Sequence, residues 1–110
     1  MTGDDTARIL DDLEQIRRSA RRIVDKGAAA FLDPDDDILR RAARSVVLDF
    51  SSAVDRLGDD VKARHPDIPW RAIRGARNVV AQYRDIQDDL IWTMLSSSLP
   101  GVVERLRYDA

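Results

Sequence analysis

Three arginines, Arg71, Arg74 and Arg77, recur at every third position of one short segment of the chain. On a helix this spacing places them along a slowly rotating ridge, and guanidinium groups along such a ridge can follow the phosphates of a nucleic-acid backbone. Gln82 follows in the same segment with an amide group that can donate and accept hydrogen bonds, and so can position RNA or a water molecule. The same spacing is also typical of a solvated helix face whose arginines pair with nearby aspartates.

The remaining candidates for chemistry give weaker signals. His65, the single histidine of the chain, precedes a proline in a connection well before Arg77, and we expect it to be a solvent-facing loop residue rather than a catalytic base. With one histidine, no cysteine and carboxylates at helix-surface spacing, we expect neither a metal site nor a cofactor. A second basic cluster is predicted to be a solvated helix face and consists of Arg17, Arg18, Arg21 and Arg22.

Apolar residues repeat every three or four positions over most of the chain, which is the period of amphipathic helices. The repeat predicts a first helix over about residues 5–30 and a second, unbroken helix from about Leu39 to about Arg64. The acidic run 33–37 between them is predicted to cap the second helix and to complement its dipole rather than to bind a metal.

The second half of the chain continues this pattern. Pro69 is well placed to open a third helix, which carries the arginine ridge. A fourth helix is expected to begin at about residues 85–88, and Ser96–Ser98 with Pro100 are expected to break it before a short last helix. Because no strand-like alternation occurs, we predict an all-α, up-and-down bundle of four or five helices.

Length and composition limit the class of protein. The 110 residues suffice for one domain, residues 1–110, and not for two. The 18 basic residues, sixteen of them arginine, nearly balance 20 acidic residues, so any contact with nucleic acid must come from a local patch. The absence of cysteine, of a basic leader and of a long apolar run leads us to expect a soluble, cytoplasmic protein without a membrane span.

The run from Arg77 to Tyr83, Arg-Asn-Val-Val-Ala-Gln-Tyr, resembles the signature Arg-Asn-x-x-x-His-x-Tyr of the HepT-like HEPN ribonucleases. The resemblance covers about Asp67 to Leu106, where the segment Asp67–Arg71, Trp92 and Leu99-Pro100 occur in the order and approximate spacing of that family. The two preceding amphipathic helices agree with the family in length only. The resemblance implies a HEPN helical bundle, which is the fold class that the apolar period predicts independently.

This resemblance implies a metal-independent RNA endonuclease that works as a homodimer, with the motifs of two subunits facing each other across one cleft. By resemblance, Arg77 holds the scissile phosphate and stabilises the charge that develops on it, while Asn78 supports the site. Tyr83 matches the tyrosine to which a nucleotidyltransferase antitoxin attaches AMP in this family, which would block the cleft with bulk and negative charge. The implied partners are therefore RNA, a second copy of the chain and the antitoxin.

The motif departs from the family pattern by one residue, because no histidine stands between Ala81 and Gln82. A histidine near its ordinary pKa could move the proton of the attacking ribose 2′-hydroxyl, whereas the amide of Gln82 has no useful pKa for that step. In an unbroken helix the shorter run also moves Tyr83 from about 20° to about 120° away from Arg77 around the axis. Either a kink near Ala81 to Tyr83 absorbs the lost residue, or the dimer cleft is built differently.

Two hypotheses of function follow. The first is the endoribonuclease toxin of a toxin–antitoxin pair, and the second is a non-catalytic HEPN subunit that binds a nucleotidyltransferase. A helical bundle that is similar to the family in structure alone is a third. A cleavage assay with and without an inserted histidine separates the first two.

Overall fold

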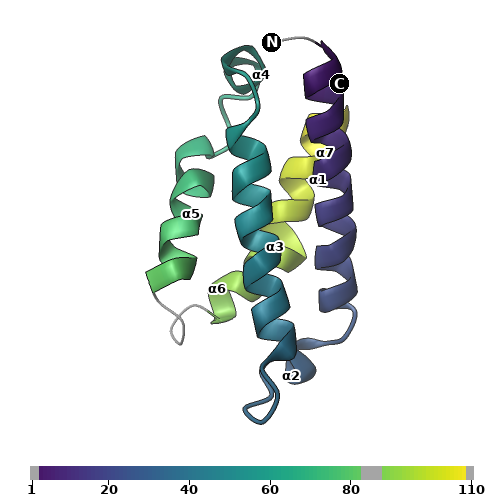
Figure 1. Cartoon of the computed structure of the whole chain (residues 1–110), viewed down its shortest axis with the longest axis vertical. Coiled ribbons are helices and arrows are strands. Elements are labelled where there is room, and N and C mark those ends of the chain that lie inside the picture. Colours follow the sequence, from purple (N-terminus) through teal and green to yellow (C-terminus); the bar gives the residue numbers. More distant parts are fainter. Residues whose placement is uncertain (1–2, 83–87, 109–110) are drawn as a thin grey trace.

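The computed structural model describes the backbone of residues 3–82 and 88–108 and the side chains of residues 5–81 and 88–108. Within these ranges the chain forms helices joined by short connections, and no strand occurs in them (Figure 1). Two short helices, α2 (Ala28–Phe31) and α4 (Asp59–Arg64), lie in connections. The long helical segments alternate in direction and are α1 (Gly3–Val24), α3 (Ile38–Asp55), α5 (Trp70–Gln82) and a continuous run of α6 (Asp88–Thr93), η1 (Met94–Ser98) and α7 (Leu99–Tyr108). The predicted all-α, up-and-down bundle is confirmed.

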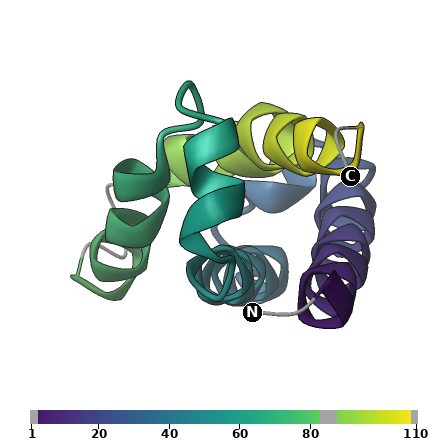
Figure 2. The same ribbon diagram turned by 90° about the horizontal axis from the view of Figure 1, so that it is seen from above.

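The third helix, α3, lies at the centre of the bundle, between α1 on one side and α5 on the other (Figure 1). Seen from above, the run from α6 to α7 lies behind α3 and beside α1 (Figure 2). The helix α5 packs mainly on α3 and is the outermost helix of the bundle. Much of the surface of α5 is therefore open to a ligand or a partner.

The apolar stripes of these helices meet in one core. The ring of Phe31 from α2 lies inside it and meets the ring of Trp92 at a centroid distance of 5.1 Å and an interplanar angle of 48°. Burial of a side chain of this kind contributes about 1.5–3 kcal/mol to the free energy of unfolding. The largest other apolar side chains that are fully buried are Phe50, Leu13, Ile91, Leu95, Leu99, Val47 and Val103.

The first predicted helix ends earlier than expected. α1 stops at Val24 rather than near residue 30, and α2 begins separately at Ala28. Gly27 between them has a φ of 94°, a left-handed backbone angle that glycine adopts easily and that interrupts α-helical geometry. The apolar repeat that predicted the first helix does not reveal this interruption, and the three alanines after Gly27 are themselves good helix formers.

The second predicted helix is likewise divided. α3 ends at Asp55, and α4 begins at Asp59. Between them the N–H of Leu57 donates to the carbonyl of Val54 at 3.0 Å, three residues earlier instead of four. Because Leu57 and Val61 are both buried, the apolar period runs across this tight turn and concealed it in the sequence.

The predicted break at Ser96–Ser98 and Pro100 is also wrong, because the chain stays helical from α6 into α7. The segment η1 is a π-helical turn, in which the N–H of Leu99 donates to the carbonyl of Met94, five residues earlier. In an α-helix a proline lacks the N–H that would bond the carbonyl four residues before it, and its ring clashes with that carbonyl. The wider π turn before Pro100 removes this conflict, so the helix continues through the proline.

A buried carboxylate joins the first and last helices. Glu14 of α1 is buried, with 7% of the whole residue exposed. Its carboxylate accepts hydrogen bonds from Arg17, at 2.9 Å from Nε and 2.5 Å from Nη2. Nη1 of Arg107, on α7, lies 2.8 Å from Oε2 of Glu14. The hydrogen bond from Arg17 outweighs the opposing effect of burial and lowers the pKa of Glu14 to about 2. α1 and α7 are thus held together by an ion pair that stays charged over the ordinary range of pH.

Candidate functional site

The arginine ridge lies on α5, which begins directly after Pro69 as the sequence predicted. The carbonyl of Pro69 accepts a hydrogen bond from the N–H of Ile73 at 3.0 Å and so closes the first turn. Ile73 and Val80 are buried, and the buried hydroxyl of Ser51 on α3 donates to the carbonyl of Ile73 at 3.0 Å. These contacts fix one face of α5 on α3 and leave exposed the side chains of Arg71, Arg74 and Arg77.

Asp55, the last residue of α3, contacts two of these three arginines. Its Oδ1 accepts a hydrogen bond from Nε of Arg74 at 2.9 Å and lies 2.8 Å from Nη2 of the same residue, while its Oδ2 lies 3.8 Å from Nη2 of Arg77. The hydrogen bond from Arg74 lowers the pKa of the Asp55 carboxyl. This ion pairing agrees with the interpretation of the ridge as a solvated helix face whose arginines pair with nearby aspartates. The side chains of Arg74 and Arg77 nevertheless remain 68% and 46% exposed. A phosphate can reach both guanidinium groups from solvent, in competition with Asp55.

The structure describes the motif after Arg77 only as far as Gln82. Asn78 is exposed at the next position of α5. The backbone remains helical through Ala81 to Gln82, the last residue of α5. Tyr83 lies outside the described residues, so its angle to Arg77 and the way in which the shortened motif is accommodated stay predictions.

His65 does not face solvent as the sequence predicted, because it is only 4% exposed. The carbonyl of His65 accepts hydrogen bonds from the N–H of Ile68 at 3.1 Å and from the indole Nε1 of Trp70 at 3.0 Å, which fold the connection back onto the core. Arg77 lies about 10 Å further along α5 than Trp70. His65 is therefore at the opposite end of α5 and is not placed to act as a base beside Arg77.

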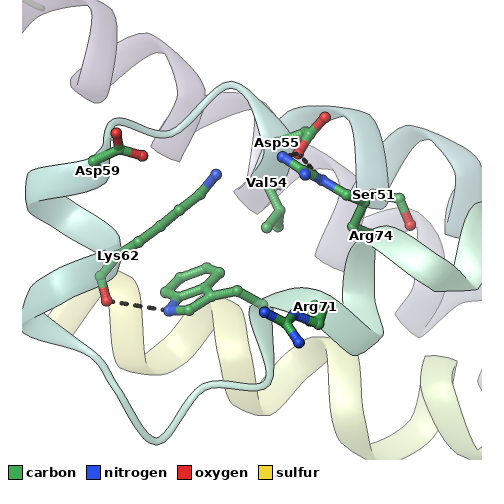
Figure 3. Close-up of a pocket in the computed structure, with 8 residues that line it drawn as sticks. Ser51, Val54, Asp55, Asp59, Lys62, Arg71 and Arg74 are labelled. Atoms are coloured by element: carbon green, nitrogen blue, oxygen red, sulfur yellow. Dashed lines mark hydrogen bonds and ion pairs between the residues drawn. The ribbon is translucent and has the colours of Figure 1, made fainter.

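A pocket of about 240 Å³ lies next to Asp55, where α3, α4 and the first turn of α5 meet (Figure 3). Figure 3 shows the side chain of Lys62 extending into the space between Asp59 and Asp55. Arg74 reaches Asp55 from the other side of the pocket. The sequence did not predict this pocket, since its residues come from three helices that only the packing of α5 on α3 brings together. The one local signal is the pair Trp70-Arg71, an aromatic ring beside a cation.

An apolar groove of about 460 Å³ lies on another side of α5, facing α6 and η1. Its wall on α5 combines small residues with the larger apolar side chains of Ile73, Val79 and Val80. Leu90 of α6 lines the groove and is 48% exposed. Exposed apolar surface of this kind typically marks an interaction site. The residues of α5 that line the groove include Ala72, Gly75, Ala76 and Val79.

The second arginine cluster lies on α1, away from the ridge. Arg17 turns inward to Glu14, whereas Arg18, Arg21 and Arg22 are exposed as the sequence predicted. Among the described residues, no three histidine, cysteine, aspartate or glutamate side chains lie close enough together to hold a metal ion. None of the described helices is both long enough and apolar enough to cross a membrane.

A family model described as Ribonuclease HepT-like matches residues 9–108, which is nearly the whole chain. No curated protein and no solved structure was found to match the chain. The matched span includes most of α1, the other long helical segments of the bundle and the arginine ridge on α5. The chain therefore belongs to the HepT-like family of HEPN ribonucleases.

Proposed function

We propose that this chain is the RNA-cleaving toxin of a toxin–antitoxin pair, acting in the cytoplasm as a homodimer that a nucleotidyltransferase antitoxin inactivates by attaching AMP to Tyr83. The observation that carries the proposal is the family match over residues 9–108, together with the exposed guanidinium of Arg77 on the outermost helix. The pairing of Arg77 with a surface carboxylate supports it, because such pairs are weak enough for a phosphate to replace them.

Several residues of α5 have different roles in the binding of RNA. Arg77 holds the scissile phosphate and stabilises the charge that develops on its oxygens during attack by the adjacent ribose 2′-hydroxyl. Asn78 supports this site, and Arg71 and Arg74 bind flanking phosphates, which fix the position of the RNA without reading its sequence. Gln82 contributes an amide that can position RNA or a water molecule.

Cleavage also requires two proton transfers. The 2′-hydroxyl loses its proton as it attacks phosphorus, and the departing 5′-oxygen gains one, which leaves a 2′,3′-cyclic phosphate and a 5′-hydroxyl. The motif lacks the histidine that would carry these protons, and His65 is buried near the other end of α5. We therefore expect the chain as it stands to bind RNA and to cleave it slowly.

The experiment compares cleavage of a labelled RNA by the chain and by a variant with one histidine inserted after Ala81. General acid–base catalysis typically contributes about 10²–10⁴-fold, so the insertion is expected to raise the rate by about two orders of magnitude or more. Arg77→Ala is expected to abolish the gain, whereas Arg22→Ala, which changes an exposed arginine of α1, is expected to leave it unchanged. If neither the unaltered chain nor the variant with the inserted histidine cleaves RNA, the toxin assignment is contradicted.

The apolar groove supports a homodimer. Because α5 carries both this groove and the ridge, a second copy seated in the groove would bring two α5 helices and two copies of Arg77 close together. Leu90→Glu is expected to give monomers on a sizing column with mass detection, since it places a charge on the exposed apolar wall. Leu32→Glu is the matched control, because Leu32 is 45% exposed and does not line the groove. A dimer that survives Leu90→Glu would place the interface elsewhere.

Regulation through Tyr83 has its own test. A nucleotidyltransferase encoded next to this chain is expected to add the mass of AMP to it and to inhibit binding of RNA through the added bulk and charge. Tyr83→Phe is expected to prevent the modification, whereas Tyr108→Phe, which changes a tyrosine that is 89% exposed, is expected to permit it. AMP on Tyr108 or on no residue would refute the assignment of Tyr83.

The missing histidine favours a second candidate function, a non-catalytic HEPN subunit that binds a nucleotidyltransferase. This candidate predicts stable association with the transferase and no cleavage of RNA, even after a histidine is inserted. The cleavage assay therefore separates the two candidates.

A further inference from the structure

The pocket beside Asp55 has an aromatic wall. The indole of Trp70 lines it, half-buried, and its Nε1 donates hydrogen bonds to two carbonyls, that of Lys62 at 3.1 Å and that of His65 at 3.0 Å. A ring held in this way loses little conformational entropy when a ligand packs against it. Aromatic rings at exposed sites are the usual stacking partners of bases in single-stranded nucleic acid.

Charged side chains of both signs surround this ring. Asp55 is already engaged by Arg74 and Arg77, as described above. Asp59, the first residue of α4, is exposed, and Figure 3 shows it across the pocket from Asp55, with Lys62 between them. An ionised carboxylate only accepts hydrogen bonds, so Asp59 favours a ligand edge that carries an N–H donor.

We propose that this pocket binds one base of the RNA by stacking on Trp70, and that Asp59 selects a base with an exocyclic amino group, such as cytosine, over uracil. Cytosine presents its N4 amino group as a donor, whereas uracil presents the O4 carbonyl at the same position, which a carboxylate repels. Both bases have a single six-membered ring and differ at the exocyclic position and at N3, which is an acceptor in cytosine and an N–H donor in uracil. Selection for cytosine therefore requires that Asp59 contact the exocyclic position rather than N3. Lys62 and Arg71, which also line the pocket, bind the phosphate attached to this nucleotide.

Asp55 connects the pocket to the motif. The same carboxylate lines the pocket and lies 3.8 Å from Nη2 of Arg77. The base in the pocket therefore belongs to a nucleotide close to the phosphate that Arg77 binds. The inference rests on the proposed function and adds a sequence preference to it, since cleavage is directed to positions near a base that carries an amino group.

The fluorescence of Trp70 tests the stacking directly. Trp92 is the other tryptophan of the chain and packs against Phe31 in the core, so Trp92→Phe leaves Trp70 as the only indole. In this variant we expect CMP to quench the emission, UMP to quench it at several-fold higher concentration, and ribose 5-phosphate, which has no base, not to quench it. The matched control is Trp70→Phe, which keeps Trp92 and is expected to show no change. No quenching by CMP overturns the base pocket, whatever the affinity of the chain for RNA.

Binding of two single-stranded RNAs of equal length, oligo(C) and oligo(U), tests the selection. The chain is expected to bind oligo(C) about tenfold more tightly, and Asp59→Asn is expected to remove this preference. Asp60→Asn changes the neighbouring exposed carboxylate, which does not line the pocket, and is expected to keep it. Equal affinity of the unaltered chain for the two RNAs overturns selection by Asp59.

Two further variants separate the inference from the function on which it rests. Trp70→Leu is expected to weaken binding of both RNAs by about 5- to 100-fold, with retention of the helical circular dichroism spectrum as the check on folding. Arg77→Ala is expected to weaken both RNAs equally and to keep the preference for oligo(C). If Arg77→Ala does not change the affinity for RNA and the preference for oligo(C) persists, the result supports the base pocket. The same result contradicts the proposed binding of a phosphate by Arg77.

Discussion

Glu14 and Asp55 are both carboxylates that contact more than one arginine, and each has at least one contact that joins two different helices. The side chain of Glu14 is 10% exposed and joins α1 to α7 through Arg107, whereas the side chain of Asp55 is 34% exposed and joins α3 to α5 through Arg74. A buried carboxylate that loses its partners becomes an uncompensated charge, but a surface pair is worth little and exchanges with solvent or another anion. The degree of exposure, rather than the ion pairing itself, therefore distinguishes the two carboxylates. The contacts of Glu14 stabilise the fold, whereas a phosphate can replace Asp55 at its arginines.

The largest expected effect comes from removing the buried charge. Glu14→Gln keeps the volume of the side chain but leaves the guanidinium groups of Arg17 and Arg107 without their carboxylate, so we expect the free energy of unfolding to fall by about 3 kcal/mol. Denaturation with urea measures the loss. Glu104→Gln, at an exposed position near the same arginines, is expected to change stability by less than about 0.5 kcal/mol. Equal losses in the two variants would remove the contrast between buried and exposed pairs.

The dependence of stability on pH sharpens the same comparison. The pKa of Glu14 is lowered from 4.5 to about 2 in the folded chain, so between these values the unfolded chain binds a proton that the folded chain does not. The stabilisation from Glu14 is therefore fully present above about pH 4.5 and is lost as the pH falls through about 2. We expect the difference in unfolding free energy between the unaltered chain and Glu14→Gln to shrink over this window. A difference that stays constant down to pH 2 would mean that packing rather than charge accounts for it.

The smallest effect is expected at the exposed pair. Asp55→Asn removes the charge that competes for Arg74 and Arg77, so we expect affinity for RNA to rise by up to about fivefold, with little change in stability. Because the folded carboxyl of Asp55 has a lowered pKa, the effect is present at neutral pH, and it should fade at high ionic strength. Asp49→Asn, at an exposed position of α3 away from the ridge, is the control for net charge. Weaker binding by Asp55→Asn alone would mean that Asp55 positions the arginines rather than competing for them.

The helices themselves could be predicted from the sequence, because their apolar period reflects contacts with the core that repeat along each helix. The ends of the helices could not. Gly27 adopts a left-handed angle after α1, but a glycine followed by alanines reads equally well as helix. The turn around Leu57 keeps the apolar period, and the π turn before Pro100 lets the chain continue where a proline normally ends a helix.

Only those parts of the candidate site whose residues are close together in the sequence could be predicted. The spacing of Arg71, Arg74 and Arg77 placed them together on one helix, and the exposure of all three agrees with that prediction. The contact of Asp55 with Arg74 depends on how α5 packs on α3, which no local pattern encodes. His65 was expected in solvent because it precedes a proline, yet the hydrogen bond from Trp70 to its carbonyl helps to draw the connection inward.

The π turn has a consequence for the helix that follows it. Arg107 of α7 reaches Glu14 on α1, while Nη2 of Arg105 donates to Oδ1 of Asp67, in the connection before α5, at 3.0 Å. A π turn adds one residue to the repeat, which shifts the phase of everything beyond it by about 100° around the axis. A chain one residue shorter in η1 would point both arginines away from their acidic partners at once. The turn that accommodates Pro100 therefore sets the angular register by which α7 is joined both to α1 and to the segment that leads into the arginine ridge.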